Sequence, residues 1–363
     1  MLKLNLFRLF AIIFAASMCY TPKVEACTGI SFTAKDGSKV IGRTMEWGTF
    51  PLDSRLVLVP RGHTQLAVTP TGKNGMRLTA KYGYAGIGVL EENFIAEGMN
   101  EKGLVGELFY FPGYGECQEY DPQKNAVSIN DAQFLAWVLG NFATVDEMKQ
   151  NIHKIRLITY GHGFQSTHFN IGDATGHQVV VEFYDGRFHI FENKIGVITN
   201  APSFDWHMTN LNNYVNVFAG MRESREIAPG VSINSFGVGS SSFGLPGDLT
   251  PPSRFVRAAF YAHTAVQQPV GHKAVMQIFQ ILNNFDVPVG AEFDKREEMP
   301  DMLSATQWTA VSDTKALKFY YKTEWNYSIR CIDLKAIDFG KAKYQVLPLD
   351  KVKEQPVEYV RFK

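Results

Sequence analysis

A cysteine at position 27 has the clearest potential for covalent chemistry in this sequence, because of the residues that precede it. Val24 and Ala26, on either side of Glu25, form a V-x-A pattern that is typical of a signal-peptide cleavage site. A cut after Ala26 would make Cys27 the first residue and give it both a thiol and an α-amine. The ordinary pKa is about 8.5 for the thiol and roughly 7.7–8.0 for the amine, so the amine can accept the thiol proton near neutral pH. Such a pair can attack a carbonyl and then protonate a leaving amine.

A basic side chain is expected beside this cysteine. Asp36-Gly37 predicts a tight turn, and the residues on either side of it alternate as two strands. This hairpin would bring Arg43 close to Cys27, where a guanidinium lowers the pKa of both the thiol and the amine. Glu46 would face the opposite way on a regular strand, so a bend or bulge is needed for both charges to line one site. The residues alone also permit a solvated Arg43–Glu46 ion pair beside a cysteine that is merely buried.

Histidines offer an alternative base. His207 would suit a Cys–His pair, but it lies near a predicted helix start, where a packing or capping role is commoner. His162 and His168 are interpreted as ordinary loop and strand histidines. The Cys and His spacings match no zinc site, so neither a metal nor a cofactor is expected.

The N-terminus is organised like an export signal. Lys3 and Arg8 supply a positive region, and residues 9–16 form an apolar run that is too short to span a bilayer. We predict a signal peptide over residues 1–26, a periplasmic or secreted protein, and no stable membrane anchor. Because neither a repeat nor a linker-like change of composition follows, residues 27–363 are expected to form a single catalytic domain.

Strand-like runs joined by short turns alternate with pairs of helical segments along the rest of the chain. Helices are expected at 128–142, 206–218, 254–263 and 272–282. Strands grouped in this way favour an α+β layered architecture over a parallel βαβ series.

Composition excludes two classes of protein. The 363 residues contain 36 Lys+Arg and 36 Asp+Glu, and 45% of them are hydrophobic. A balanced charge gives no electrostatic footprint for nucleic acid, so no nucleic-acid partner is expected, and this hydrophobic content argues against disorder. Cys19 would leave with the signal peptide. Whether Cys117 and Cys331 form a disulfide or remain separate thiols stays open.

Five short motifs follow one another along the chain. They are C-T-G at 27–29, G-R-T-M-E-W at 42–47, E-G-M-N-E-K-G-L at 97–104, T-N-A-P-S-F-D-W-H at 199–207 and G-L-P-G-D-L-T-P-P-S-R-F at 244–255. Together they resemble the choloylglycine hydrolases, a group of N-terminal-nucleophile hydrolases that includes conjugated bile salt hydrolases and penicillin V acylases. Each motif is weakly specific by itself, but five in order behind a cleavable leader are a strong signal.

The resemblance implies a four-layer αββα sandwich and cofactor-free hydrolysis of a linear amide. By the family pattern, Cys27 is the nucleophile, its freed amine is the base, and Arg43 tunes that pair. Asn200 would donate a hydrogen bond to the tetrahedral oxyanion, and Arg254 would support the surroundings of the nucleophile. Glu46 stands where the family commonly has aspartate, which retains a carboxylate with a longer reach.

The resemblance also bears on the substrate, a small-molecule N-acyl amide. Tyr110 stands where bile salt hydrolases of the Gram-positive type usually carry Asn, and tyrosine there is a feature of certain penicillin V acylases. Its ring offers an apolar wall, and its backbone N–H would be a further oxyanion donor. Other residues expected to contact the substrate are Phe50, Tyr84, Phe111 and Tyr114. Conjugated bile salts, phenoxyacetyl-type penicillins and N-acyl homoserine lactones all remain open.

The sequence leaves two other functions open and also suggests an oligomeric state. The alternatives are a lipid-amide or ceramide-type hydrolase of the same superfamily, and a non-catalytic small-molecule binder that retains the pocket. The segment 213–247 is placed like the projection that builds a homotetramer in this family, so the resemblance implies a homotetramer.

Overall fold

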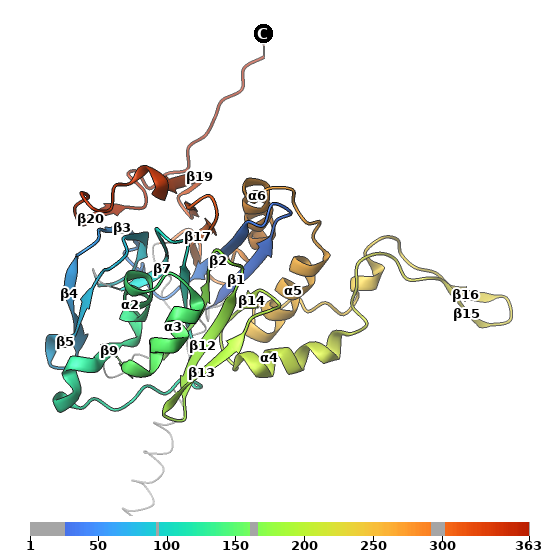
Figure 1. The fold of residues 1–363 in the computed structure, drawn as a ribbon. Helices are drawn as coiled ribbons and strands as arrows, with labels where there is room; N and C mark the ends of the chain where they lie inside the picture. Colours follow the sequence, from blue (N-terminus) through green and yellow to red (C-terminus); the bar gives the residue numbers. More distant parts are fainter. Residues whose placement is uncertain (1–25, 92–93, 160–165, 292–301, 363) are drawn as a thin grey trace, which may run out of the picture.

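The structure is a computed structural model that describes residues 26–91, 94–159, 166–291 and 302–362 (Figure 1). Apart from Ala26, the predicted signal peptide lies outside the described residues. Two large antiparallel sheets dominate the body of the molecule.

The first sheet has six strands and contains Cys27. In spatial order they are β14 (Val197–Ile198), β1 (Cys27–Thr33), β2 (Lys39–Glu46), β17 (Thr306–Asp313), β18 (Lys318–Thr323) and β19 (Asn326–Asp333). β1 and β2 form the predicted hairpin, which places Thr33 opposite Lys39 and Cys27 opposite Met45. Gly37 in the turn has a φ of 82°, a conformation that glycine adopts without steric cost.

The second sheet has eight strands. In spatial order they are β13 (Arg187–Glu192), β12 (Gln178–Tyr184), β11 (Thr167–Gly172), β8 (Val105–Tyr110), β7 (Ile95–Asn100), β6 (Tyr84–Gly88), β3 (Arg55–Val59) and β20 (Gln345–Pro348). Most neighbours in this sheet are also neighbours in sequence, as expected for strands that are joined by short turns.

Helices cover the outer faces of both sheets. α5 (Pro251–Thr264) and α6 (Gly271–Leu282) together pack on β1, β2 and β17, while α2 (Phe134–Asn141) packs on β7 and β8 (Figure 1). The order is helix, sheet, sheet, helix. This order confirms the α+β class and the four-layer αββα sandwich.

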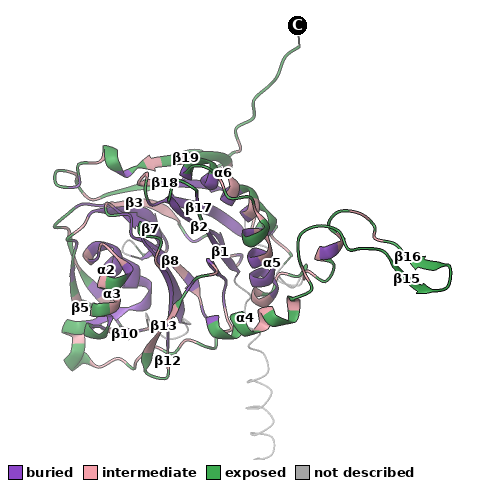
Figure 2. Ribbon diagram, turned by 45° about the vertical axis from the view of Figure 1, so that its right-hand side comes forward, coloured by how far each residue is buried: buried purple, intermediate pink, exposed green. Residues whose placement is uncertain are grey.

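Successive residues of β2 show how the layers are built. A Cβ added at Gly42 would stand 3.0 Å from Ile278 of α6, whereas the guanidinium of Arg43 lies 4.3 Å from the ring centroid of Phe109 on β8. One face of the strand therefore meets a helix and the other meets the second sheet. Figure 2 shows the buried residues concentrated on these strands and on the helix faces toward them. Burial of each large apolar side chain there contributes about 1.5–3 kcal/mol to folding.

Shorter elements occupy the periphery. β4 (Thr64–Thr69) pairs with β5 (Gly72–Thr79), β9 (Ser128–Asn130) with β10 (Arg156–Ile158), and β15 (Arg225–Ala228) with β16 (Val231–Ile233). α3 (Val145–Asn151) follows α2, and α4 (Phe204–Asn210) follows β14.

Two predicted helices are shorter than expected. The segment 128–142 becomes α-helical only at Phe134, because residues 128–130 pair with β10 and the Asn130 side chain accepts a hydrogen bond from the Gln133 amide at 3.0 Å. The segment 206–218 is α-helical only to Asn210. The helices expected at 254–263 and 272–282 are confirmed. Among the helices of the described ranges, none combines the length and apolarity that a bilayer crossing requires.

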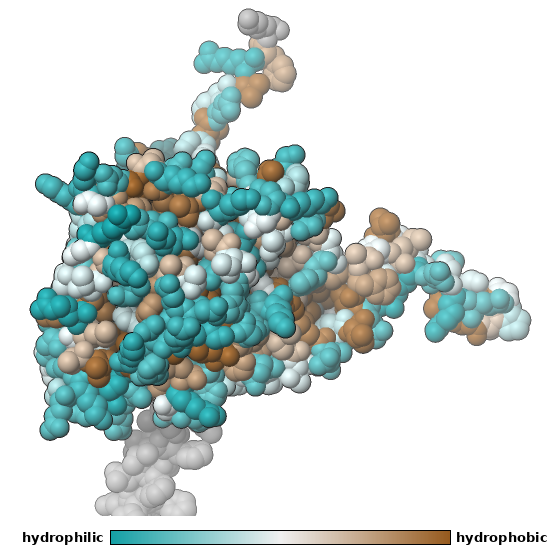
Figure 3. Space-filling model, viewed as in Figure 1, coloured by the Kyte–Doolittle hydropathy of each residue, from teal (hydrophilic) through white to brown (hydrophobic). Residues whose placement is uncertain are grey.

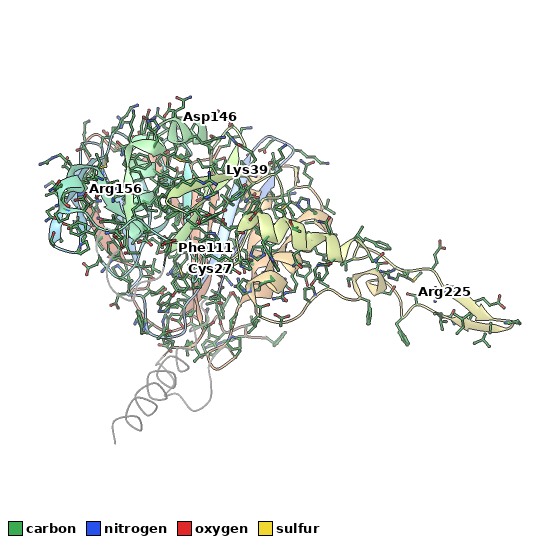
Figure 4. The ribbon with its side chains drawn as sticks, turned by 90° about the horizontal axis from the view of Figure 1, so that it is seen from below. Cys27, Lys39, Phe111, Asp146, Arg156 and Arg225 are labelled. Carbon is green, nitrogen blue, oxygen red and sulfur yellow. The ribbon has the colours of Figure 1, made fainter. Side chains whose placement is uncertain are left out.

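Residues 215–244 leave the body as an exposed arm that ends in the β15–β16 ribbon (Figures 1 and 3). Figure 4 labels Arg225 on this ribbon, far from Cys27 in the body. The apolar side chains exposed along the arm are Val215, Phe218, Met221, Ile227, Val231, Ile233, Phe236, Val238 and Phe243. Exposed apolar surface of this kind is typical of a contact region. Assembly of a homotetramer through it stays a prediction.

Candidate active site

Cys27 begins β1 in the space between the two sheets. It lies opposite Met45 of β2, and Arg43 lies opposite Gly29, two residues further along β1. Directly paired residues project to the same face of an antiparallel ladder, so Arg43 lies diagonally beside Cys27, as the turn predicted. Gly29 permits the close approach of the second sheet, since a Cβ there would stand 2.9 Å from the ring of Phe109.

The thiol of Cys27 is almost completely buried. The residue is 3% exposed, and its Sγ lies 4.0 Å from the Sδ of Met45. Burial raises the pKa of the thiol; the charges of Arg43 and Arg254 oppose this rise, and the carboxylate of Glu46 adds to it. A thiol with a raised pKa is protonated at neutral pH. Nucleophilic attack therefore requires a base within hydrogen-bond reach.

The side chain of Arg43 crosses from β2 to the second sheet. Its guanidinium donates to the carbonyl oxygens of Ala96, at 3.4 Å, and of Leu108. It also lies over the ring of Phe109, and its Nη2 is 3.6 Å from the Sδ of Met45. These contacts hold a fully buried positive charge next to the thiol.

Glu46 turns to the other face of β2. Its Oε1 accepts a hydrogen bond from Thr306 Oγ1 at 3.1 Å, whereas its neighbours Met45 and Trp47 line the cavity at the thiol. The irregularity that the sequence required is present, but it lies in β17, where the register shifts between Thr306 and Trp308. The expectation that the Glu46 side chain lines the site is therefore corrected. Glu46 acts on the thiol through the charge of its carboxylate, which raises the thiol pKa, and through its backbone amide, which lowers it.

Asn200 and Arg254 meet at the backbone of Cys27, from which they are 173 and 227 residues away in sequence. The Oδ1 of Asn200 accepts hydrogen bonds from the Cys27 nitrogen at 2.7 Å and from Arg254 Nη2 at 2.8 Å. Its Nδ2 donates to the carbonyl oxygen of Tyr110 at 2.8 Å. Arg254 also donates to the Cys27 carbonyl and to Thr28 Oγ1. Asn200 thus connects β1 of the first sheet to β8 of the second sheet.

The thiol opens onto a small apolar cavity of about 50 Å³. Its walls include Met45, Trp47, Leu52, Phe94, Leu108 and Tyr110. Trp47 and Tyr110 meet edge to face with ring centroids 6.0 Å apart, and the exposed Phe50 packs on Trp47 at 5.3 Å. Tyr110 is therefore a wall of the cavity, and Phe50 extends the same aromatic cluster outward. Sequence reasoning missed Trp47, although it lies two residues beyond the strand partner of Cys27.

The structure separates the other residues that were expected to contact substrate. Phe111 is fully buried and stacks on His168, with ring centroids 4.3 Å apart. Tyr114 is half exposed and packs against Phe111, with ring centroids 5.9 Å apart. Tyr84 is buried on the far side of the second sheet, where its ring lies near Gly140 of α2. We therefore do not retain Tyr84 and Phe111 as cavity residues.

His207 lies at the backbone of Asn200 rather than at the thiol. Its Nε2 is 2.9 Å from the Asn200 carbonyl oxygen. Burial lowers the pKa of the ring to about 4. A base this weak does not accept a thiol proton at neutral pH, so the geometry does not support a Cys–His pair.

The remaining cysteines are unpaired in the structure. Cys117 is half-buried and Cys331 is exposed, and both are free thiols, as is Cys27. Over the described ranges, no group of three or more His, Cys, Asp or Glu side chains is arranged to hold a metal ion.

A pair of carboxyl groups that the sequence did not reveal lies behind Arg43. Glu97 of β7 and Glu107 of β8 are directly opposite each other and fully buried. Asn170 Nδ2 donates to Glu107 at 2.6 Å. Burial raises the pKa of Glu107 to about 7, against the opposing effects of the Asn170 hydrogen bond and the charges of Arg43 and Lys39. Burial and the charge of Glu107 raise the pKa of Glu97.

We expect Glu107→Gln to remove a pH-dependent contribution to folding. The ordinary pKa of 4.5 rises to about 7 on folding, so the folded state binds this proton more tightly. The resulting stabilisation is complete below pH 4.5 and is lost as the pH rises through 7, by on the order of 3 kcal/mol. The melting temperature of the variant relative to the natural protein should therefore rise between about pH 4.5 and 7.5. A difference that stays constant over this range would contradict the expectation.

Comparisons with known proteins identify the family. Residues 27–346 match the linear amide C–N hydrolases of the choloylglycine hydrolase family. The chain is 34% identical over 314 residues to the bile salt hydrolase/transferase of Clostridium perfringens, which covers 85% of this chain and 92% of that protein. A solved cysteine-to-alanine mutant of the conjugated bile acid hydrolase from Clostridium perfringens matches with a TM-score of 0.80 at 30% identity, covering 92% of this chain and 100% of that chain.

A more distant solved structure agrees. The penicillin V acylase from Agrobacterium tumefaciens matches with a TM-score of 0.70 at 25% identity, covering 89% of this chain and 92% of that chain. The match to the family extends over nearly the whole chain that follows the predicted cleavage site. The chain therefore belongs to the choloylglycine hydrolase family and is a linear amide C–N hydrolase.

Proposed function

We propose that the protein is an exported cysteine amidohydrolase that cleaves an N-acyl amide through an acyl thioester on Cys27. The observation that carries the proposal is the set of hydrogen bonds around Asn200. They hold the Cys27 nitrogen, the Arg254 guanidinium and the Tyr110 carbonyl together, next to a thiol that opens onto an apolar cavity.

The mechanism begins with removal of the residues before Cys27. Ala26 is fully buried, and its carbonyl accepts a hydrogen bond from the Glu46 amide at 3.0 Å, so the chain is held on both sides of the bond to be cut. While this bond is intact, the nitrogen of Cys27 is an amide and has no basicity to offer. After the cut it is an amine, and it can take the proton that the buried thiol retains at neutral pH.

The amide is then cleaved in two steps. The sulfur attacks the acyl carbon, the C–S bond forms, and the negative charge develops on the carbonyl oxygen. Asn200 Nδ2 has two hydrogens, one of which is donated to Tyr110, and the other is available to this oxyanion. The Cys27 ammonium protonates the leaving nitrogen as the C–N bond breaks. Water, deprotonated by the same amine, then hydrolyses the thioester to release the acid.

The lining of the cavity indicates which acyl groups the protein would accept. Apolar and aromatic side chains at the thiol favour an apolar acyl group. The names of the relatives mention two kinds of substrate, bile salts and penicillin V. The rings of Trp47 and Tyr110 wall this cavity edge to face, and they offer flat apolar contact to a phenoxyacetyl group or an unbranched chain. Tyr110 also stands where certain penicillin V acylases carry tyrosine and bile salt hydrolases of the Gram-positive type usually carry Asn. We therefore propose penicillin V and long-chain N-acyl homoserine lactones as better substrates than conjugated bile salts.

A substrate panel with one common readout tests the proposal. Penicillin V, long-chain acyl lactones, and taurine- and glycine-conjugated bile salts are each assayed for liberated amine, and the intact protein is weighed after rapid acid quenching. We expect amine release and an acyl adduct on Cys27. Faster turnover of the bile salts would overturn the preference alone. The absence of both amine and adduct with every compound would contradict the mechanism and favour a pocket that only binds.

A further inference from the structure

Two buried histidines contact the carbonyl oxygens of two successive residues. His168 on β11 lies with its Nε2 2.9 Å from the Thr199 oxygen, and His207 on α4 lies with its Nε2 2.9 Å from the Asn200 oxygen. Both histidines are at most 2% exposed. The sequence indicated a packing or capping role for His207 and an ordinary strand position for His168. Neither histidine lines the cavity at the thiol.

The backbone at these two carbonyls needs such partners. β14 is an edge strand of only two residues, whose ladder to β1 pairs Val197 with Ile30 and Ile198 with Gly29. Thr199 and Asn200 follow directly, beyond the end of this ladder. Because a buried carbonyl without a hydrogen bond is costly, the histidines take the place that strand partners would have. They hold the segment from which the Asn200 side chain projects.

Each imidazole is itself fixed. His168 stacks on Phe111 with ring centroids 4.3 Å apart and an interplanar angle of 8°, and its Nδ1 lies 3.3 Å from Glu182 Oε1. His207 stacks on Phe255 at 4.6 Å and 9°. Glu182 Oε1 also accepts a hydrogen bond from the Phe204 amide at the start of α4. The two histidines are therefore connected through Glu182 and α4 into one support.

The partners determine where the protons lie. A carbonyl oxygen only accepts, so the Nε2 of each ring carries a hydrogen. In His168 the Nδ1 faces the Glu182 carboxyl group. Nδ1 of His207 has no hydrogen-bond partner among the described residues, and burial keeps this ring neutral near pH 7. His207 is thus a hydrogen-bond donor to the backbone and not a proton carrier for the thiol.

We propose that His168 and His207 are positioning residues that hold the Thr199–Asn200 segment, so that the Asn200 amide stays between the Cys27 nitrogen and the Tyr110 carbonyl. The inference rests on the proposed function of Asn200 at the oxyanion. Because one of the two Nδ2 hydrogens is already committed to Tyr110, a small rotation or shift of the segment would misdirect the other. Errors of about 1 Å in such geometry cost up to about 100-fold in rate.

The test compares two substitutions at His207. His207→Leu removes the donor, whereas His207→Gln places an N–H at the position of Nε2. We expect kcat to fall about 10- to 100-fold in His207→Leu, with KM within about two-fold, and to recover most of its value in His207→Gln. His168→Leu and His168→Gln are compared in the Glu182→Gln background, so that no buried carboxylate is left unpaired, and the same recovery is expected.

A matched control is available at His263. Its Nε2 lies 3.0 Å from the Ile195 carbonyl, a bond of the same kind just before β14, but it is exposed and distant from Asn200 along the segment. His263→Leu should leave kcat unchanged. Equal losses of kcat in His207→Leu and His263→Leu would show a general effect on β14 and overturn the inference.

A double-mutant cycle separates this inference from the proposed function. Asn200→Ala alone should reduce kcat about 10²- to 10³-fold, and adding His207→Leu should cause no further loss. If His207→Leu lowered kcat as much in the Asn200→Ala background as in the natural protein, the positioning role would be overturned. A normal kcat in Asn200→Ala would overturn the proposed role of Asn200 and the inference with it. A loss in Asn200→Ala together with a normal kcat in His207→Leu would overturn the inference alone.

Discussion

Replacing Cys27 by alanine is expected to abolish turnover while leaving the fold intact. The substitution removes the only atom proposed to form the acyl bond, and loss of a nucleophile of this kind costs at least about 10⁴-fold in kcat. The structural cost is small, because the lost sulfur makes only weak contacts, among them the Sδ of Met45 at 4.0 Å and the backbone amide of Glu46. Amine release and the melting temperature are measured on the same preparation.

Cys117→Ala is the matched control for this experiment. Its thiol is also partly buried, 3.9 Å from Ser166 Oγ, but it does not line the cavity at Cys27. The control should keep turnover near that of the natural protein. Turnover well above background in Cys27→Ala would dismiss the thiol as nucleophile, and an equal loss in Cys117→Ala would indicate a general sensitivity to cysteine replacement.

Blocking the α-amine of Cys27 is also expected to cause a large loss of kcat. A glycine inserted between Ala26 and Cys27 would remain on the chain after cleavage and convert the Cys27 nitrogen into an amide. Because an amide nitrogen does not accept a proton near neutral pH, the buried thiol would lose its base, and we expect kcat to fall by about 10²- to 10⁴-fold. Chain integrity is checked by mass and stability by melting temperature, and the loss should persist at every pH between about 6 and 9.

A glycine inserted before Thr21 is the control, because the predicted cleavage removes it. This chain should have the same mass after export and the same kcat as the natural protein. If the chain with glycine before Cys27 kept its normal kcat, another group would have to accept the thiol proton, and the proposed role of the amine would be wrong.

Local patterns predicted the parts of the fold that depend on neighbours in sequence. The turn at Asp36-Gly37 and the alternation around it gave the correct hairpin, and the parity of that strand correctly set Glu46 on the opposite face from Arg43. The helix start at 128 was wrong because its polar residues serve another purpose. Asn130 caps the turn before α2 and also donates to the Val68 carbonyl, a tertiary contact that no helical period reveals.

The assembled site could not be derived from local patterns. Asn200 and Arg254 reach Cys27 only after both sheets have formed, so the sequence indicated them through family resemblance alone. The prediction that Tyr84 contacts the substrate was wrong for a different reason. It is a buried aromatic on a central strand, and which of the two layers it enters depends on the register of that strand, which places it beneath α2.

Buried polar residues were the least predictable part. Glu97 and Glu107 lie in segments whose sequence pattern is that of any strand. Their pairing follows from the register between β7 and β8. A sequence does not show that two carboxyl groups will share a buried position behind a guanidinium, because exposed glutamates in strands have the same local pattern.

The most direct measurement is the intact mass of active enzyme recovered from the compartment to which it is exported, before and after reaction with a slowly released acyl substrate. The account predicts a chain that begins with the residue-27 cysteine and gains one acyl group there. Fully active material that retains any preceding residue, or that begins further along the chain, would contradict it.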